Sequence, residues 1–259
     1  MHEWYAAPME GLTGWRWRQV QHEMFGRAAL YVTPFVSPNG NFSFQRKELE
    51  ELDPERNRGI PVVPQILTNR AEYFVWAAKE CRSRGWAQVD LNLSCPSGTV
   101  TGKKKGAGLL RQPELLRQLL DGIFDALPDM KISVKTRIGW ERAEEWPALL
   151  ALLETYPICR LTVHPRVRTQ FYKGTADREV FRWTAEHTAL PLCYNGDVTT
   201  VRDLWEMGEA FPDDAVMVGR GLVADPSLLR QATGGPAASL EELREFHDRL
   251  YGLYCRDFS

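Results

Sequence analysis

The sequence of 259 residues lacks the cysteine patterns that organise disulfide-rich and zinc-binding proteins. It has five cysteines, an odd number, with no C-x-x-C pair and no spacing typical of metal ligands. These absences argue against a disulfide framework and a metal site, and they favour a reduced compartment. We therefore expect a cytoplasmic protein without a bound metal. The cysteines are Cys81, Cys95, Cys159, Cys193 and Cys255.

The sequence also lacks long apolar runs and a strong excess of charge. It has no stretch of about 18 apolar residues, and no cationic segment followed by an apolar one opens it. These absences argue against a membrane partner and against secretion. The formal net charge of -2 gives no overall basic surface, so a nucleic acid would have to be bound by a local patch. No repeat or low-complexity tract divides the chain, and a monomer is expected.

What the sequence does contain is a series of short apolar runs with helical patterns between them. The runs are rich in Val, Leu and Ile without clean alternation, as expected of parallel strands buried on both faces. Residues 37–59 are polar and are predicted to be partly loop. The helical segments are Arg70–Arg84, Pro113–Ala126, Glu144–Glu154 and Thr199–Gly208. The predicted strands are Trp4–Ala7, Leu30–Val36, Val62–Ile66, Ala87–Asn92, Lys131–Thr136, Arg160–His164, Leu192–Asn195 and Ala215–Gly219.

This alternation of strands and helices predicts a (β/α)8 TIM barrel, an α/β fold whose typical length is about 250 residues. A doubly wound open sheet is the rival fold, but it normally has a G-x-G-x-x-G loop after its first strand. Here the first strand is followed by APMEGLTG, which lacks that spacing. The barrel is therefore favoured.

The barrel is expected to occupy residues 1–232, and a short helical extension residues 233–259. Gly234, Gly235 and Pro236 interrupt the chain, and Ser239 then precedes Glu242 with the spacing of a capping box. The extension has two interpretations: its helix docks on the barrel, or it is the first helix of an appended domain. Its apolar stripe comprises Leu240, Leu243, Phe246, Leu250 and Leu253.

Polar or turn-forming residues follow nearly every predicted strand. In a barrel of this kind the chemistry collects at the C-terminal ends of the strands. Each residue alone is more often structural, but the whole set indicates a functional site. The set is Pro8, Met9, Gln65, Asn92, Cys95, Lys135, Arg137, His164, Arg166, Arg168, Asn195, Gly196, Asp197, Gly219 and Arg220.

Two of these strand ends, YNGDV and VGRGL, put a glycine directly after a barrel strand. Backbone N–H groups can approach an anion closely there, and barrel phosphate sites commonly use the loops after strands 7 and 8. Arg220 adds a guanidinium suited to phosphate, and Lys135 is placed to set a cation beside an electron-rich ring. This layout fits a phosphorylated cofactor with a ring, for which flavin mononucleotide (FMN) is the natural candidate. The alternative is that the glycines serve only as tight turns.

A set of motifs runs in order through residues 4–231. It consists of APMEGLTGWRWR, Gln65, LNLSCPSGTVTGKKKGAGLL, SVKTRIGW, LTVHPRVRTQFYKGTADREV, YNGDV and VMVGRGL. In this combination the set resembles the tRNA-dihydrouridine synthase family. Single blocks such as YNGDV also resemble other FMN barrels, whereas N-x-x-C-P followed by G-A-x-L-L, V-K-T-R, H-x-R and Y-x-G is specific.

The resemblance implies an FMN-dependent enzyme that reduces the C5–C6 double bond of particular uridines in tRNA, with NADPH recharging the flavin. It also implies that Cys95 is the proton donor. The residues that it assigns to FMN are Pro8, Met9, Gln65, Lys135, His164, Asn195, Gly196, Asp197, Gly219 and Arg220.

The thiol in LNLSCPSGTV suits this reaction, because reduction of uracil needs hydride at C6 and a proton at C5. A thiol with the usual pKa of about 8.5 is still protonated at neutral pH. Pro96 stiffens the turn that carries Cys95, and Asn92 at the strand end is placed to hydrogen-bond the pyrimidine. The cysteines in apolar patterns, which are expected to be packing residues, are Cys81, Cys159 and Cys193.

The sequence departs from the family pattern in three respects. Ser94 replaces the usual glycine before the cysteine, and Pro34 stands where a glutamate is common. The family normally follows its barrel with a helical bundle that helps to bind tRNA, and this sequence has about one such helix. A local cationic patch is therefore expected to bind tRNA or another structured RNA, unless its lysines form only a solvated loop. The candidates are Lys103, Lys104, Lys105, Arg166, Arg168 and Lys173.

Two other functions remain open on the sequence. The same barrel and cysteine could reduce a free small-molecule enone or pyrimidine, which the short C-terminal region favours and the full motif set opposes. An inactive descendant that only binds RNA or a protein partner is weakened, because the expected strand-end positions all carry suitable chemistry.

Overall fold

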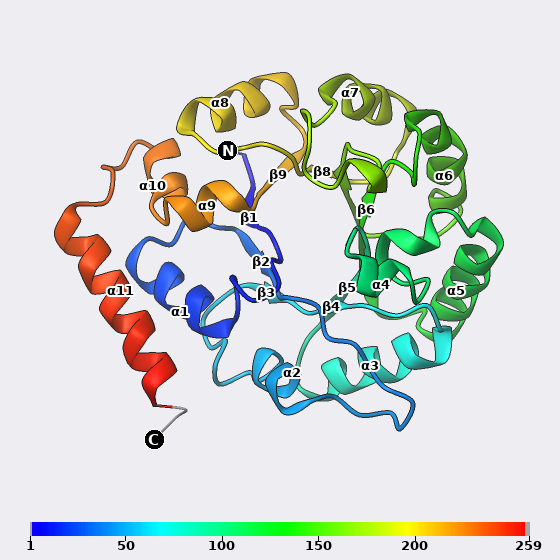
Figure 1. The fold of residues 1–259 in the computed structure, drawn as a ribbon, viewed down its shortest axis with the longest axis horizontal. Coiled ribbons are helices and arrows are strands. Elements are labelled where there is room, and N and C mark those ends of the chain that lie inside the picture. Colours follow the sequence, from blue (N-terminus) through cyan, green and yellow to red (C-terminus); the bar gives the residue numbers. More distant parts are fainter. Residues whose placement is uncertain (1, 257–259) are drawn as a thin grey trace.

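In the described part of the chain, nine short parallel strands form the sheet, in the order β3-β2-β1-β9-β8-β7-β6-β5-β4. The computed structural model describes residues 2–256. Figure 1 shows the strands at the centre of the molecule with helices around them. The predicted TIM barrel is confirmed. The strands are β1 (Trp4–Ala6), β2 (Leu30–Val32), β3 (Val62–Val63), β4 (Gln65–Ile66), β5 (Gln88–Leu93), β6 (Lys131–Arg137), β7 (Arg160–His164), β8 (Leu192–Tyr194) and β9 (Ala215–Val218).

The strands β3 and β4 are two halves of the single predicted strand at residues 62–66. Pro64 separates them, because proline has no N–H to donate to the strand ladder. β3 pairs with β2 and β4 pairs with β5, so the interrupted strand joins the two ends of the sheet. The predicted strand at residues 30–36 is shorter than expected, and only a bridge from Val36 to Ile66 continues it. The eight expected strands are thus all present.

The helices form a ring outside the strands and cover their outer faces (Figure 1). Residues 37–59 contain one short helix between loops, in agreement with the sequence. The ring consists of α1 (Trp15–Met24), α2 (Arg46–Glu51), α3 (Ala71–Ser83), α5 (Pro113–Ala126), α6 (Trp146–Leu153), α7 (Arg178–His187) and α8 (Val201–Ala210). Short helical turns in the connections are α4 (Gly98–Thr101), η1 (Gly106–Leu109), η2 (Ala143–Glu145), η3 (Arg168–Gln170), α9 (Arg220–Ala224) and α10 (Leu228–Ala232).

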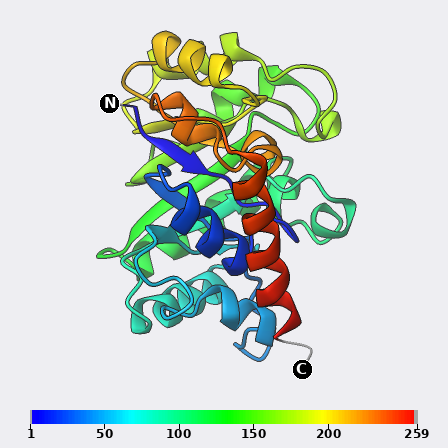
Figure 2. The same cartoon turned by 90° about the vertical axis from the view of Figure 1, so that its left-hand side faces the viewer.

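The helix α11 (Leu240–Cys255) lies alongside α1 on the outside of the barrel (Figure 2). The expected capping box is formed, with the Glu242 N–H donating to the Ser239 hydroxyl at 3.1 Å. The Phe246 ring packs against Phe25 with centroids 5.7 Å apart, and Arg230 pairs with Glu242 at 2.8 Å. The helix thus contacts the barrel through Phe246 and Glu242.

Two layers of apolar residues stabilise the barrel. The larger one lies between the strands and the surrounding helices and includes Cys81, which is fully buried. A smaller cluster, which includes Tyr5, Cys193 and Met217, is separate from it. Cys81 and Cys193 are thus packing residues, whereas Cys159 is only half-buried. Among residues 2–256, no helix combines the length and the apolar character needed to cross a membrane.

Candidate active site

A cavity of about 330 Å³ opens at the C-terminal ends of the strands. Its size is typical of small-molecule sites, and its position is where barrel enzymes place their chemistry. All the residues that the sequence assigns to FMN line it, together with Asn92 and Cys95. The cavity therefore gathers side chains from β1, β4, β5, β6, β7, β8 and β9 or from the loops that follow them.

Lys135 supplies a buried cation to this cavity. Burial lowers the pKa of its ammonium group to about 8, and the nearby Arg137 guanidinium acts in the same direction, whereas the Asp90 carboxylate opposes them. Its Nζ donates to the hydroxyl of Ser94 at 3.3 Å. The serine that replaces the family's usual glycine thus contacts the cation directly. Lys135 remains mostly charged at neutral pH.

His164, by contrast, is held neutral. Burial holds its pKa well below the usual value, and the adjacent cations Lys135, Arg137 and Arg166 act in the same direction. The Nη1 group of Arg166 lies 3.2 Å from Nε2 of His164. Because a guanidinium can only donate, Nε2 accepts and the proton of the neutral ring is on Nδ1.

A chain of hydrogen bonds under the cavity fixes the orientation of two amides. The carboxylate of Asp90 accepts from Nε2 of Gln65 at 2.8 Å and from the Ser133 hydroxyl at 2.7 Å. Oε1 of Gln65 must therefore accept, and Nδ2 of Asn92 donates to it at 2.7 Å. Oδ1 of Asn92 in turn accepts the backbone N–H of Cys95 at 2.9 Å. A buried carboxylate thus sets the position of the cysteine through two amides.

This chain changes the interpretation of Asn92. Its carbonyl oxygen accepts from the N–H groups of both Ser94 and Cys95, and one of its two amide protons goes to Gln65. One N–H is left for a pyrimidine. Asn92 therefore acts first as a positioning residue for the Cys95 loop.

The Cys95 loop is fixed at three consecutive carbonyl groups. The oxygens of Ser94, Cys95 and Pro96 accept from Nε of Arg137 at 3.0 Å, from the N–H of Ala107 at 3.1 Å and from Nε of Arg168 at 3.1 Å, respectively. A Cβ on Gly106 would lie 2.9 Å from the Cys95 oxygen, which explains the glycine of G-A-x-L-L. The loop is therefore held rigidly from three directions.

Burial raises the pKa of the Cys95 thiol, although the Ser97 N–H, Arg137 and Lys135 act in the opposite direction. The thiol is therefore protonated at neutral pH. It lines the cavity and is only partly exposed. A protonated thiol on a rigid loop can deliver its proton to a substrate atom above the cavity floor.

Asp197 holds two arginines at the rim. Its carboxylate accepts from Nη2 of Arg220 at 2.8 Å and from Nη2 of Arg166 at 2.5 Å. Burial alone would raise its pKa, but the hydrogen bonds from Arg166 and Ala176 and the two positive charges lower it. Asp197 is therefore ionised and orients Arg220, whose side chain is half exposed at the cavity. Gly196 is required by packing, because a Cβ there would lie 2.5 Å from that of Ala176.

The expected RNA-binding cations are not equivalent. Arg166 is buried and bonded to Asp197, Gly174, Lys173 and His164, so it is a structural residue of the site. The prediction that Arg166 contacts an RNA phosphate was wrong, because the buried side chain has no exposed surface for that contact. Other members of the set also lie outside the cavity lining: Lys103 and Lys104 are exposed, Lys105 donates to the Ser37 hydroxyl at 3.0 Å, and Arg168 holds the Cys95 loop.

Sequence reasoning missed Asp90 and Ser133 and gave no role to Arg137. The spacing of these residues was a usable signal. Asp90 lies two residues before Asn92 on one strand, and Ser133, Lys135 and Arg137 follow at intervals of two on the next. Because residues two apart on a strand share a face, this spacing places Asp90, Ser133 and Arg137 on the same side as the predicted site residues.

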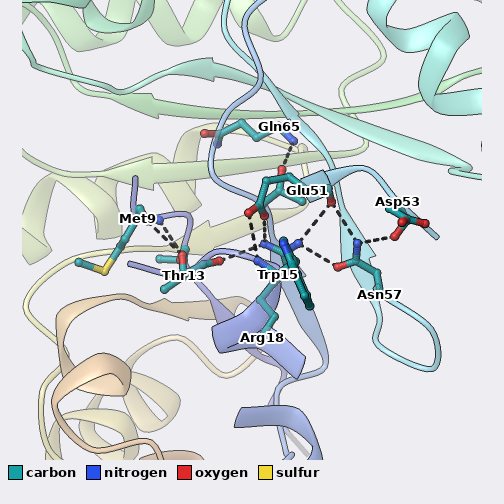
Figure 3. A network of polar contacts seen from close by, with 10 residues as sticks. Met9, Thr13, Trp15, Arg18, Glu51, Asp53, Asn57 and Gln65 are labelled. Atoms are coloured by element: carbon teal, nitrogen blue, oxygen red, sulfur yellow. Dashed lines mark hydrogen bonds and ion pairs between the residues drawn. The ribbon is translucent and has the colours of Figure 1, made fainter. Parts of the chain in front are cut away.

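The loop after β1 forms another wall of the cavity and is anchored from behind (Figure 3). The N–H of Met9 donates to the Thr13 hydroxyl at 2.8 Å, and the Thr13 carbonyl accepts from Nη1 of Arg18 at 3.0 Å. Arg18 is fully buried, pairs with Glu51 at 2.8 Å and donates to Oδ1 of Asn57 at 2.8 Å. Glu51 also accepts the N–H of Trp15 at 3.1 Å. The first turn of α1 and the segment after α2 thus hold Met9 in place.

The fold occurs in solved oxidoreductase structures. The old yellow enzyme homologue of Zymomonas mobilis (NCR) matches with a TM-score of 0.62 at 11% identity, over 93% of this chain and 91% of that one. At this identity the likeness is one of fold. The barrel, together with the match to the dihydrouridine synthase family model, places the protein in the class of flavin-dependent (β/α)8 oxidoreductases.

Within that class the chain belongs to the dihydrouridine synthase (Dus) family, whose model matches residues 5–248. The probable tRNA-dihydrouridine synthase of Rhizobium leguminosarum bv. phaseoli is 33% identical over 221 residues, covering 85% of this chain and 68% of the relative. The tRNA-dihydrouridine synthase B of Proteus vulgaris is 29% identical over 261 residues, covering 96% of this chain and 80% of the relative. The family resemblance seen in the sequence is confirmed.

Proposed function

We propose that the protein reduces the C5–C6 double bond of specific uridines in tRNA to dihydrouridine, with FMN as bound cofactor and NADPH as reductant. The observation that carries the proposal is the protonated Cys95 thiol on a rigid loop beside a cavity that also contains Lys135 and His164. The names of the curated relatives supply the substrate class.

The residues of the cavity fit a flavin. FMN, when bound and reduced by NADPH, supplies hydride for C6 of the uracil. Lys135 supplies a positive charge to an electron-rich ring, and the oriented amide of Gln65 presents hydrogen-bonding groups to it. Arg220, Gly219 and Gly196 lie at the rim where the phosphate would be held, with Asp197 fixing the guanidinium of Arg220.

Cys95 transfers the proton that completes the reduction. Its Sγ–H bond breaks as a C–H bond forms at C5 of the uracil, which leaves a thiolate. The nearby cations Arg137 and Lys135 stabilise that thiolate, since both lower the pKa of Cys95. The chain from Asp90 to Asn92 keeps the backbone of Cys95 fixed during the transfer.

The proposal is tested by two measurements on the intact protein and its host. The purified protein is expected to be yellow and to release FMN, identified by chromatography against FMN and FAD standards. RNA from cells lacking the gene is expected to lose dihydrouridine at specific tRNA positions and regain it on complementation. A colourless protein that takes up no FMN, or an unchanged RNA profile combined with turnover of a free enone or pyrimidine, would contradict the proposal.

The Lys135 charge makes the flavin sensitive to pH. The pKa of Lys135 is about 8, so its positive charge is present below that pH and is lost as the pH rises through it. We expect the reduction potential of the bound flavin to fall more steeply with pH around 8 than that of free FMN. Asp90→Asn should move this extra slope to lower pH, because the Asp90 carboxylate favours the charged lysine. Spectroelectrochemical titration measures the extra slope in the unaltered protein and its shift in Asp90→Asn. An extra slope that persists in Lys135→Met would show that it does not come from Lys135.

The exposed lysines of the Cys95 loop are expected to bind RNA phosphates. Replacing Lys103 and Lys104 with alanine should lower the salt slope of RNA binding by about 0.7–0.9 for each phosphate that is no longer neutralised. The FMN content should not change, because neither residue lines the cavity. The control is the double variant with alanine at Lys79 and Lys131. Lys79 is exposed on α3, and Lys131 is exposed at the start of β6, at the opposite end of the barrel from the cavity. Equal salt slopes for the two double variants would show that the Cys95 loop does not bind RNA.

A further inference from the structure

A row of planar side chains extends from the Cys95 loop to Phe171, the residue before Tyr172 of the cavity lining. The guanidinium of Arg111 lies 4.3 Å from the centre of the Trp140 ring, and that of Arg168 lies 4.6 Å from the same ring. Arg168 also lies 4.7 Å from the centre of the Phe171 ring. The row therefore consists of two cations and two aromatic rings, and we call it the Phe171 platform.

The platform is built on backbone contacts between two loops. The N–H of Arg168 donates to the Gly139 carbonyl at 2.9 Å, and the N–H of Thr169 donates to that of Trp140 at 3.1 Å. The Arg168 side chain donates to the Pro96 carbonyl and to the Thr101 hydroxyl. The platform is thus fixed beside the catalytic loop. Tyr172, the next residue after Phe171, lines the cavity.

Phe171 combines an exposed ring with a backbone conformation that phenylalanine rarely adopts. Its φ is 51° and its ψ is −100°, and a positive φ of this size favours glycine. The residue is 39% exposed, and its ring packs on Arg168. Strained residues of this kind cluster at ligand-binding sites, because the surrounding structure holds them in place.

We propose that the Phe171 platform stacks on a nucleobase next to the target uridine. The inference rests on the proposed function, because a uridine can reach the cavity only by leaving the base stack of its RNA. Its neighbour then loses a stacking partner, and an aromatic ring at the rim replaces it. Arg111 is exposed at the other end of the platform and is placed to meet the phosphate of the same strand.

The chemistry of the platform favours RNA over a protein partner. Base stacking on an aromatic ring tolerates every base, and a guanidinium next to the ring suits the phosphate that accompanies each base. In the described part of the chain, neither Arg111 nor Arg168 forms an ion pair with a carboxylate. Both positive charges therefore remain uncompensated beside the ring.

The test compares Phe171→Ala, Phe171→Leu and Phe171→Trp in the FMN-loaded enzyme with in vitro transcribed tRNA. Removing the stacking partner of one base is expected to lower RNA affinity and kcat/KM by about 5- to 150-fold in the alanine variant. Leucine should not restore binding and tryptophan should, because the interaction needs an aromatic face. Arg111→Ala should lower the salt slope by about 0.7–0.9, whereas Phe171→Ala should leave it unchanged.

Phe42→Ala is the matched control. Phe42 is 45% exposed and has a φ of 51°, but its ring packs on Tyr73 and Trp76 of α3 and does not line the cavity. If Phe171→Ala binds and modifies RNA like Phe42→Ala, the platform does not stack on a base. The same conclusion follows if Phe171→Leu binds RNA as tightly as the unaltered enzyme. If the unaltered enzyme neither binds nor reduces any RNA, the proposed function fails and this inference fails with it.

Discussion

Replacing Cys95 with alanine is expected to lower the rate of dihydrouridine formation about 10²–10⁴-fold, the usual effect of losing a general acid. FMN content and flavin reduction by NADPH should remain largely intact, because the thiol acts only after hydride has been transferred. Cys95→Ser should also lose most activity, since a hydroxyl is a much weaker acid than a thiol. Single-turnover kinetics with pre-reduced enzyme and tRNA separates the reduction of flavin from the reduction of uridine.

The other cysteines provide the controls for this experiment. Cys193 is fully buried and does not line the cavity, and burial raises its pKa to about 12; Cys159 is half-buried outside the cavity lining. Cys159→Ala should keep full activity, and Cys193→Ala should keep it at temperatures where the protein stays folded. If Cys95→Ala kept full turnover while Cys159→Ala or Cys193→Ala lost activity, the proton donor would be a residue other than Cys95.

Replacing Arg18 with methionine is expected to destabilise the protein by about 3–5 kcal/mol, the usual effect of removing one partner from a buried ion pair. Arg18 is fully buried, and its removal leaves Glu51, Asn57 and the Thr13 carbonyl without their donor. Since Thr13 holds Met9 at the cavity wall, the affinity for FMN should fall as well. Urea denaturation followed by circular dichroism measures the first effect, and flavin fluorescence titration the second.

Arg46→Met is the matched control for the buried pair. Its guanidinium pairs with Glu50 at 3.5 Å, but the side chain is 93% exposed. An exposed pair of this spacing contributes about 0.3–0.5 kcal/mol, so the free energy of unfolding should hardly change. Similar values for the two variants would mean that the network in Figure 3 does not anchor the cavity wall.

The sequence determined the barrel, the position of each strand and most of the site. These features depend on local pattern: an apolar run without alternation marks a buried parallel strand, and the residue at its end faces the barrel mouth. For this reason Lys135, His164 and Cys95 could be named in advance, and the structure places all three around one cavity. The sequence also contains the cause of the break between β3 and β4, which is Pro64, but the interruption of the strand by this proline was not predicted.

Only the tertiary structure decided what the remaining polar residues do. Arg168 contacts Pro96, 72 residues away, and Arg166 contacts Asp197, 31 residues away. The sequence shows that a cation is present but not which distant carbonyl or carboxylate accepts its hydrogen bonds. For this reason Arg166 and Arg168 were both expected to be free to bind RNA. The orientation of Asn92 depends in the same way on Gln65 and Asp90, since hydrogen-bond direction is set by the partner and not by the residue itself.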